Sequence, residues 1–433
     1  MRKEKRRKSR EKGRNSPKDQ LMHFFIHTMG CKLNRYDSAV VAGLLSPALI
    51  ETGDPEEADL IILNTCTVTH KAEREARRLA RSLKRRNREA KVVVMGCSTR
   101  FAPEAYRIME EVDEVITGPE ELRALAGTLG IPPSSQPAAK LRFNGRTRAF
   151  LKVQEGCSYP CTYCIIPKVR GRSVSVPEEE VRDDFLNLLE DGYREIVLTG
   201  VNTGEWGRDL GGNRRLEDLL SGLLELEGDF RIRLNSVEPR AVTPGLIALL
   251  RKGEKLAKHL HVPLQSGSDP VLKAMRRNYR SGFYSELLAR IAEEVPAIGI
   301  GVDVIAGFPT ETAEDFGATL SLLEESPVAF LHAFSYSPRA GTPASRLTSL
   351  PAGEIASRVR ALRELGAEKK RKFAGRFIGK ELRALTLGSG ESAKRALTGN
   401  FLDVTLSGET TPNRFINIIV KSVEDGIVRA GLR

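Results

Sequence analysis

The chain has 433 residues, of which 40% are hydrophobic and 29% charged, with a formal net charge of +12. This length is too great for one small core and indicates two or three domains. No apolar run approaches the ~20 residues that a membrane helix needs, and the first residues lack the apolar stretch of a secretory signal. We therefore expect a cytoplasmic protein without membrane contact. Its excess of positive charge favours a polyanionic partner.

The first 20 residues are strongly basic, with ten Lys or Arg against three Asp or Glu. Apolar residues are almost absent there, so we predict a basic disordered tail over residues 1–20. Two interpretations of this tail stay open, a solubilising arm and a non-specific tether for RNA.

Residues 21–130 predict an α/β domain with a doubly wound parallel sheet. Short apolar runs alternate with helical patterns, as is typical of parallel sheets. The predicted strands cover 23–28, 59–65, 91–96 and 114–118, and a predicted helix lies near 71–88.

Three cysteines, Cys31, Cys66 and Cys97, follow strands of this predicted sheet. The carboxyl ends of parallel strands meet at one edge of an open sheet, where ligands bind. Three loops would therefore bring three thiolates together at a metal site. The alternative is that these residues are buried structural cysteines.

Residues 131–145 are rich in Pro and Ser and predict a linker. The following residues, 146–372, contain six strand-like runs that alternate with helical patterns, fewer than the eight of a full barrel. The predicted strands are 149–153, 195–198, 230–234, 259–264, 298–305 and 328–334. Loops at the carboxyl ends of such strands face the cavity, so the residues there are site candidates.

Histidines and one aspartate in these strands carry a weaker signal. Alternation puts His259 and His261 on the same face of a strand, where packing inside the barrel is a better interpretation than metal ligation. Asp303 lies within a strand and is interpreted as a polar group of the barrel, outside the predicted site.

Cys157, Cys161 and Cys164 form a CxxxCxxC motif in a loop after the first of these strands. Thiolates are the usual ligands of iron–sulfur clusters, and three of them leave one iron for a substrate or cofactor. Structural zinc is the alternative. Zinc sites tend to pair two CxxC or CxxC/HxxxH halves, and no histidine lies near this loop.

Six motifs together resemble the radical S-adenosylmethionine (SAM) methylthiotransferases, and among these the tRNA N6-threonylcarbamoyladenosine branch. The motifs are HTMGCKLN, NTCTVT, GCSYPCTYCIIPKVRGR, HVPLQSGSDPVLKAMRRNY, DVIAGFPTET and FSYSPRAGTPA. The resemblance implies a partial radical SAM barrel, two [4Fe-4S] clusters and SAM. It further implies that a methylthio group is inserted at C2 of N6-threonylcarbamoyladenosine, at position 37 in the tRNA anticodon loop.

The same resemblance assigns roles to single residues. Cys157, Cys161 and Cys164 would hold the cluster that binds SAM and would be the catalytic residues. Cys31, Cys66 and Cys97 would hold an auxiliary cluster. Six further residues would contact SAM: Tyr163, Gly200, Glu238, Gln265, Ser266 and Gly307.

Residues 373–433 change to a β pattern with glycine turns, which predicts a small all-β barrel. This segment is similar to the TRAM modules that bind tRNA, and a purely structural cap is the alternative. The expected partners are tRNA and an electron donor such as flavodoxin or ferredoxin, and we expect a monomer. Other possible functions are the isopentenyladenosine branch, the ribosomal-protein aspartate branch, a non-catalytic RNA-binding protein that carries clusters, and a zinc-stabilised RNA-binding protein.

Overall fold

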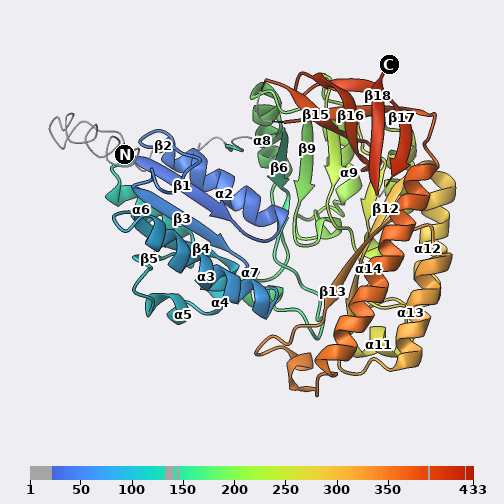
Figure 1. Ribbon diagram of the computed structural model, residues 1–433, viewed down its shortest axis with the longest axis horizontal. Helices are drawn as coiled ribbons and strands as arrows, with labels where there is room; N and C mark the ends of the chain where they lie inside the picture. Colours follow the sequence, from blue (N-terminus) through green and yellow to red (C-terminus); the bar gives the residue numbers. More distant parts are fainter. Residues whose placement is uncertain (1–21, 132–140, 144–146, 389–390, 425) are drawn as a thin grey trace, which may run out of the picture. The chain divides into compact units, whose positions relative to one another are not determined.

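The computed structural model describes residues 22–131, 141–143, 147–388, 391–424 and 426–433. The predicted basic tail and most of the predicted linker lie outside these residues. The chain divides into two compact units (Figure 1). Of the described residues, 22–29, 38–65 and 73–131 form the first unit, and 30–37, 66–72 and everything from Leu141 onward form the second.

A five-stranded sheet forms the centre of the first unit, with strand order β2-β1-β3-β4-β5 and parallel pairing throughout. The strands are β1 (His23–Thr28), β2 (Ile50–Glu51), β3 (Leu60–Thr65), β4 (Lys91–Gly96) and β5 (Glu114–Val115). The helices are α2 (Lys32–Leu45), α3 (His70–Arg86), α4 (Cys97–Phe101), α5 (Glu104–Arg107) and α6 (Pro119–Thr128). This strand order is that of a doubly wound sheet.

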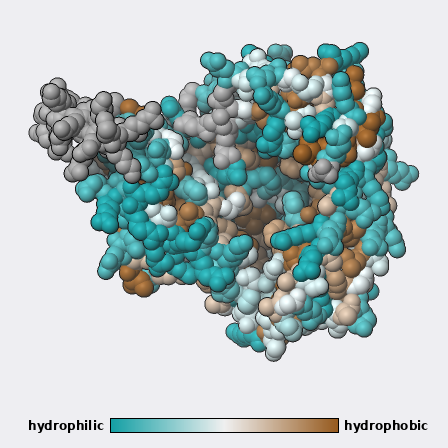
Figure 2. Space-filling model, viewed as in Figure 1, coloured by the Kyte–Doolittle hydropathy of each residue, from teal (hydrophilic) through white to brown (hydrophobic). Residues whose placement is uncertain are grey.

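Helices cover both faces of this sheet because successive strand residues point to opposite sides. Leu60 and Ile62 of β3 pack in a core with α2 and α6. Ile61 and Leu63 pack in a second core with α3 and α5. The doubly wound architecture predicted from the sequence is confirmed. On the face shown in Figure 2, hydrophilic residues predominate over this unit.

Six parallel strands form the centre of the second unit. They are β6 (Arg148–Lys152), β9 (Glu195–Thr199), β10 (Arg231–Leu234), β11 (His259–His261), β12 (Gly299–Ala306) and β13 (Phe330–Ser335). β6, β9 and β10 form one run and β11, β12 and β13 another, and Val237 N–H donates to His261 O at 2.9 Å between the runs. Within the described residues no pairing joins β6 to β13, so the strands form an open, partial barrel.

Helices alternate with these strands along the chain, as in other β/α repeats. They are α7 (Ile166–Arg170), α8 (Glu178–Glu190), α9 (Leu216–Leu224), α10 (Pro244–Lys252), α11 (Asp269–Ala274), α12 (Ser281–Glu294), α13 (Ala313–Glu325) and α14 (Ala352–Gly375). The short strands β7 (Gln154–Glu155) and β8 (Val174–Ser175) pair antiparallel and close the base of the cysteine loop. The short 3-10 helices are Thr203–Glu205, Pro239–Ala241 and Pro343–Arg346.

A closed five-stranded barrel ends the chain, with strand order β14-β15-β16-β18-β17. Its strands are β14 (Glu381–Leu387), β15 (Ala393–Thr398), β16 (Asp403–Thr410), β17 (Phe415–Glu424) and β18 (Ile427–Leu432). The predicted small all-β unit is therefore confirmed. The sequence pattern did not show β15, because Lys394 and Arg395 interrupt its apolar residues.

Two buried arginines of β10 fix the C-terminal barrel to the central strands. Arg231 donates to Leu397 O at 2.8 Å, and Arg233 donates to the carbonyl oxygens of Thr398 and Gly399 at 3.0 Å. Both arginines also pair with the buried carboxylate of Glu195. Buried charges need such partners, so this network makes the two parts of the unit structurally dependent on each other.

Candidate functional site

The CxxxCxxC loop begins at a glycine that no other residue can replace without rearrangement. Gly156 has a φ of +69°, and a Cβ atom added there would lie 1.9 Å from the carbonyl oxygen of Arg172. Cys157 N–H donates to Gly171 O at 3.0 Å across the same loop. The two ends of the loop are therefore closed tightly against each other.

The middle of the loop is attached to the segment after β11. Thr162 N–H donates to Met275 O at 3.1 Å, and the Thr162 hydroxyl donates to Ala274 O at 2.9 Å. Cys164 N–H donates to Cys161 O at 3.2 Å, which makes a turn between these two cysteines. The hydrogen bonds hold three thiols on one short, ordered segment.

Two thiols of this loop, those of Cys157 and Cys164, are largely removed from solvent. Burial raises the pKa of Cys157 to about 11 and that of Cys164 to about 12, and neighbouring cysteines of the loop add to both shifts. Metal binding to them would release protons, since thiolates are the ligands. This donor set fits an iron–sulfur cluster.

A basic side chain that sequence reasoning missed lies at this loop. Arg277 Nη1 donates to Cys161 Sγ at 3.3 Å, and Nη2 forms an ion pair with Glu238. Burial raises the pKa of Glu238, and the Arg277 guanidinium only partly offsets this. Arg277 thus bridges Cys161 of the loop and the carboxylate of Glu238. The signal for Arg277 was its place in the motif HVPLQSGSDPVLKAMRRNY.

One cavity brings several predicted site residues together. It has a volume of about 220 Å³ and is lined by Tyr163, Cys164 and Gln265, with Asp303 on its wall. Gln265 has a φ of +69°, and its backbone pairs with β12 through Asp303 O at 2.8 Å. A non-glycine residue in this conformation is strained, and such strain is concentrated at functional sites. The cavity opens beside the cysteine loop.

The other three predicted SAM contacts take part in packing. A Cβ added at Gly200 would lie 2.8 Å from Gln154 Oε1, so this glycine makes room for Gln154. The Ser266 hydroxyl is buried and accepts a hydrogen bond from Ser268 N–H at 3.2 Å. Gly307 has a φ of +77°, and its N–H donates to Glu311 Oε2 at 2.8 Å. Their contact with SAM stays a prediction.

The strand pairing of the first sheet shows where Cys31, Cys66 and Cys97 lie relative to the strand ends. Thr65 of β3 pairs with Gly96 of β4, and Cys66 and Cys97 are the next residues in the chain. Met29 N–H donates to Asn64 O at 2.8 Å, two residues before Cys31. The neighbouring strands β1, β3 and β4 are thus each followed closely by one of these cysteines. A Cβ added at Gly30 would lie 2.8 Å from the Cβ of Cys66, which shows how closely the chain before Cys31 approaches Cys66.

A second group that the sequence did not indicate lies on the central strands. His261, Asp303 and His332 come from β11, β12 and β13, and one carboxylate oxygen of Asp303 lies within 3.1 Å of a nitrogen of each ring. His332 was absent from every predicted motif.

Among the described residues no helix is long and apolar enough to cross a bilayer.

Two family models match the chain, "Uncharacterized protein family UPF0004" over residues 23–118 and "Radical SAM superfamily" over residues 151–323. The threonylcarbamoyladenosine tRNA methylthiotransferase MtaB of Rickettsia prowazekii is 33% identical over 418 residues, which are 94% of this chain and 97% of that protein. A tRNA-2-methylthio-N(6)-dimethylallyladenosine synthase of Carboxydothermus hydrogenoformans is 33% identical over 363 residues, which are 77% of this chain and 81% of that protein.

A solved structure shares the fold. The radical S-adenosylmethionine methyltransferase TsrM from Kitasatospora setae aligns with a TM-score of 0.55 at 15% identity, over 75% of this chain and 77% of that chain. At this identity the comparison shows the architecture alone.

The open six-stranded barrel, with three cysteines in the loop after its first strand, defines a radical SAM enzyme. The chain belongs to the radical SAM methylthiotransferase family, as its motifs predicted. It is accordingly an enzyme that transfers a sulfur-containing group, and its cofactors are [4Fe-4S] clusters and SAM.

Proposed function

We propose that this chain inserts a methylthio group at C2 of N6-threonylcarbamoyladenosine at position 37 of tRNA. Support comes from the relative in Rickettsia prowazekii, which is named for this substrate and matches 94% of the chain. The observation that carries the proposal is the pair of cysteine trios, each at the ends of parallel strands. Two clusters in one chain are what radical chemistry combined with sulfur insertion requires.

The side chains have separate tasks in this proposal. Cys157, Cys161 and Cys164 hold one cluster, and the loop hydrogen bonds keep them on one ordered segment. When bound, this cluster and SAM supply the radical chemistry that an aromatic C–H demands and that side-chain bases do not provide. Arg277 offsets negative charge at Cys161, and it fixes the carboxylate of Glu238 close to the site.

The second trio, Cys31, Cys66 and Cys97, holds the auxiliary cluster that presents sulfur to the base. The strand ends of the first sheet support this assignment, since β1, β3 and β4 are neighbours and each is followed by one of the cysteines. The cavity wall formed by Tyr163 and Gln265 orients SAM and excludes water.

Substrate RNA would be recognised as an unstacked base of the anticodon loop, with additional contacts to its backbone. The C-terminal barrel is the TRAM-like module that we propose to bind tRNA. We further propose that the protein is a cytoplasmic monomer and that it receives electrons from flavodoxin or ferredoxin.

Nucleoside mass spectrometry of tRNA from cells that lack this gene tests the substrate. We expect 2-methylthio-N6-threonylcarbamoyladenosine to disappear and N6-threonylcarbamoyladenosine to accumulate, with recovery when the gene is restored. If the methylthio derivative of threonylcarbamoyladenosine persists while that of isopentenyladenosine is lost, the substrate assignment is wrong.

A second candidate is the isopentenyladenosine substrate, favoured by the relative in Carboxydothermus hydrogenoformans. The mass spectrum distinguishes the two substrates directly. Purified protein with reconstituted clusters tests catalysis itself: incubation with SAM and a reductant should yield 5′-deoxyadenosine. If the reconstituted protein binds tRNA but forms no 5′-deoxyadenosine, catalysis is refuted and the chain acts as a binding protein.

A further inference from the structure

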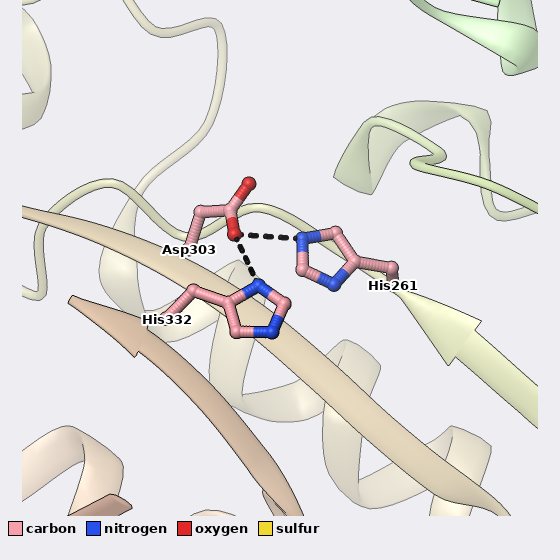
Figure 3. A group of neighbouring side chains, drawn as sticks. All are labelled: His261, Asp303 and His332. Carbon is pink, nitrogen blue, oxygen red and sulfur yellow. Dashed lines mark hydrogen bonds and ion pairs between the residues drawn. The ribbon is translucent and has the colours of Figure 1, made fainter. Parts of the chain in front are cut away.

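The His261–Asp303–His332 group joins three neighbouring strands at a second cavity of the barrel (Figure 3). Asp303 and His332 are paired residues of β12 and β13, and His261 pairs with Gly301 of β12. This cavity has a volume of about 500 Å³, and all three side chains line it. Its size is that of a pocket for a small organic group.

Hydrogen bonding fixes which nitrogen of each ring carries a proton. Asp303 Oδ1 lies 2.9 Å from His261 Nε2 and 3.1 Å from His332 Nδ1. Burial opposes ionisation of Asp303, but the hydrogen bonds from both rings outweigh it and hold the pKa of this carboxyl below its usual range. An ionised carboxylate only accepts, so both of these nitrogens are donors.

The two rings differ in their exposure. The His261 side chain is 10% exposed, and a Cβ added at Gly301 would lie 2.8 Å from its Nδ1, so this ring is fixed by packing. The His332 side chain is 55% exposed. Its Nδ1 is directed to Asp303 (Figure 3), so its Nε2 remains for a ligand.

Positive charge surrounds the same cavity. Arg148 lines it and pairs with Glu195 at 3.3 Å. Arg231 and Arg233 pair with that same carboxylate. Lys32 and Arg35 line the cavity together with Arg148, so three basic residues face one acidic residue, Asp303, and the net charge of the lining is positive. An anionic ligand is the natural complement of such a wall.

We propose that His332 binds the carboxylate of the threonylcarbamoyl group of the substrate adenosine, and that Asp303 and His261 position its ring. This inference rests on the proposed function and names the residue that selects the substrate. The Nδ1 of His332 is directed to the carboxylate of Asp303 and its Nε2 is left for the carboxylate of the ligand, so the ring bridges the two groups. Asp303 and His261 are positioning residues, and His332 touches the substrate.

An isopentenyl group would fit this cavity poorly. Its hydrocarbon chain offers no partner to His332, and a polar group that is buried without a partner loses its hydrogen bonds to water. The same residues that favour the anionic substituent therefore disfavour the apolar one.

Binding of anticodon stem-loop RNA to the enzyme with both clusters in place tests this proposal at constant salt. Three RNAs are compared: one with N6-threonylcarbamoyladenosine at position 37, one with its threoninamide analogue, which lacks the carboxylate, and one with unmodified adenosine. The wild-type enzyme should bind the first about tenfold more tightly than the second, the difference expected for one charge-assisted hydrogen bond.

The variant His332→Ala should reduce this preference to within about twofold and leave affinity for the amide analogue unchanged. Asp303→Asn should reduce it partly, because the ring is then no longer held. His23→Ala, at a partly exposed histidine of β1 in the other unit, is the matched control and should keep the full preference.

Full preference in His332→Ala, or equal loss of affinity for all three RNAs, would overturn the proposal. So would stoichiometric zinc or manganese that is present in the wild-type protein and absent from His332→Ala, since a metal would then occupy these nitrogens. Equal binding of the first and third RNAs by the wild-type enzyme would instead count against the proposed substrate, whatever His332 does.

Discussion

Arg277 contacts the cysteine loop by a hydrogen bond from its guanidinium to Cys161 Sγ. A cation next to a cluster sulfur stabilises the more negative, reduced cluster. We expect Arg277→Gln to make the midpoint potential of this cluster more negative and to slow 5′-deoxyadenosine formation about tenfold, as for loss of one charge-assisted contact. Redox titration followed by electron paramagnetic resonance measures the potential.

Arg280→Gln, at an exposed arginine three residues further on, serves as the control for this variant. Arg277→Lys should recover part of the activity, because it keeps the charge but not the two-pronged geometry. An unchanged potential in Arg277→Gln would show that the contact has no electronic effect on the cluster.

Asp184 of α8 gives a pH dependence of stability. Burial, together with Glu180 and Asp183, raises the pKa of Asp184 to about 6. A carboxyl whose pKa is higher in the folded state destabilises the fold when it ionises. The free energy of unfolding therefore falls as the pH rises from the ordinary pKa of 3.8 to the folded-state pKa of about 6. Asp184→Asn should therefore be more stable than the wild type by about 1 kcal/mol at pH 8, after allowance for solvent screening.

Thermal unfolding midpoints of Asp184→Asn and wild type, measured from pH 4 to pH 8, check this. The difference should be constant above pH 7, be roughly halved near pH 5 and fall to about a fifth of its full value at pH 4, where the folded state carries the proton and the unfolded state carries it in part. A difference that is independent of pH would assign the gain to packing.

Among the elements, the cysteine loop offers a matched pair of glycines. Gly156 and Gly171 both have positive φ, +69° and +76°. A Cβ at Gly156 would collide with the backbone of Arg172, whereas at Gly171 nothing lies within 4 Å. Gly156→Ala should therefore disrupt the loop and lose the iron of this cluster. Gly171→Ala should keep the iron and cost only about 1 kcal/mol of conformational strain.

Iron and sulfide analysis of the two purified variants tests this prediction, with circular dichroism to verify that both are folded. Equal iron content in both would mean that the collision at Gly156 is relieved by a shift of the loop.

Elements with a clear local pattern could be predicted from the sequence. β3 and β4 are continuous apolar runs, so their ends, and with them the places of Cys66 and Cys97, followed directly. β15 was missed because two basic residues break its pattern. Predicted strand 259–264 is shorter in the structure, where β11 ends at His261.

Contacts between segments that are distant in the chain could not be predicted from local sequence patterns. Arg277 meets Cys161 across 116 positions of the chain, and His332 meets Asp303 only through strand pairing. Spacing within a segment says nothing about either, since they depend on how the barrel closes. Glu195 likewise reads as an ordinary strand residue until Arg231 and Arg233 are seen around it.

At the scale of the whole molecule, the proposed function gives each of the two cysteine trios a separate part of one reaction. The variant with Cys157, Cys161 and Cys164 changed to alanine should lose about half of the iron and all 5′-deoxyadenosine formation. The variant with Cys31, Cys66 and Cys97 changed to alanine should also lose half of the iron, yet it should still cleave SAM. Only the wild-type protein should then form methylthio-nucleoside, because radical generation and sulfur supply would depend on separate clusters. Iron analysis and mass spectrometry of both products check this, and methylthio-nucleoside from the second variant would refute the role of the second trio.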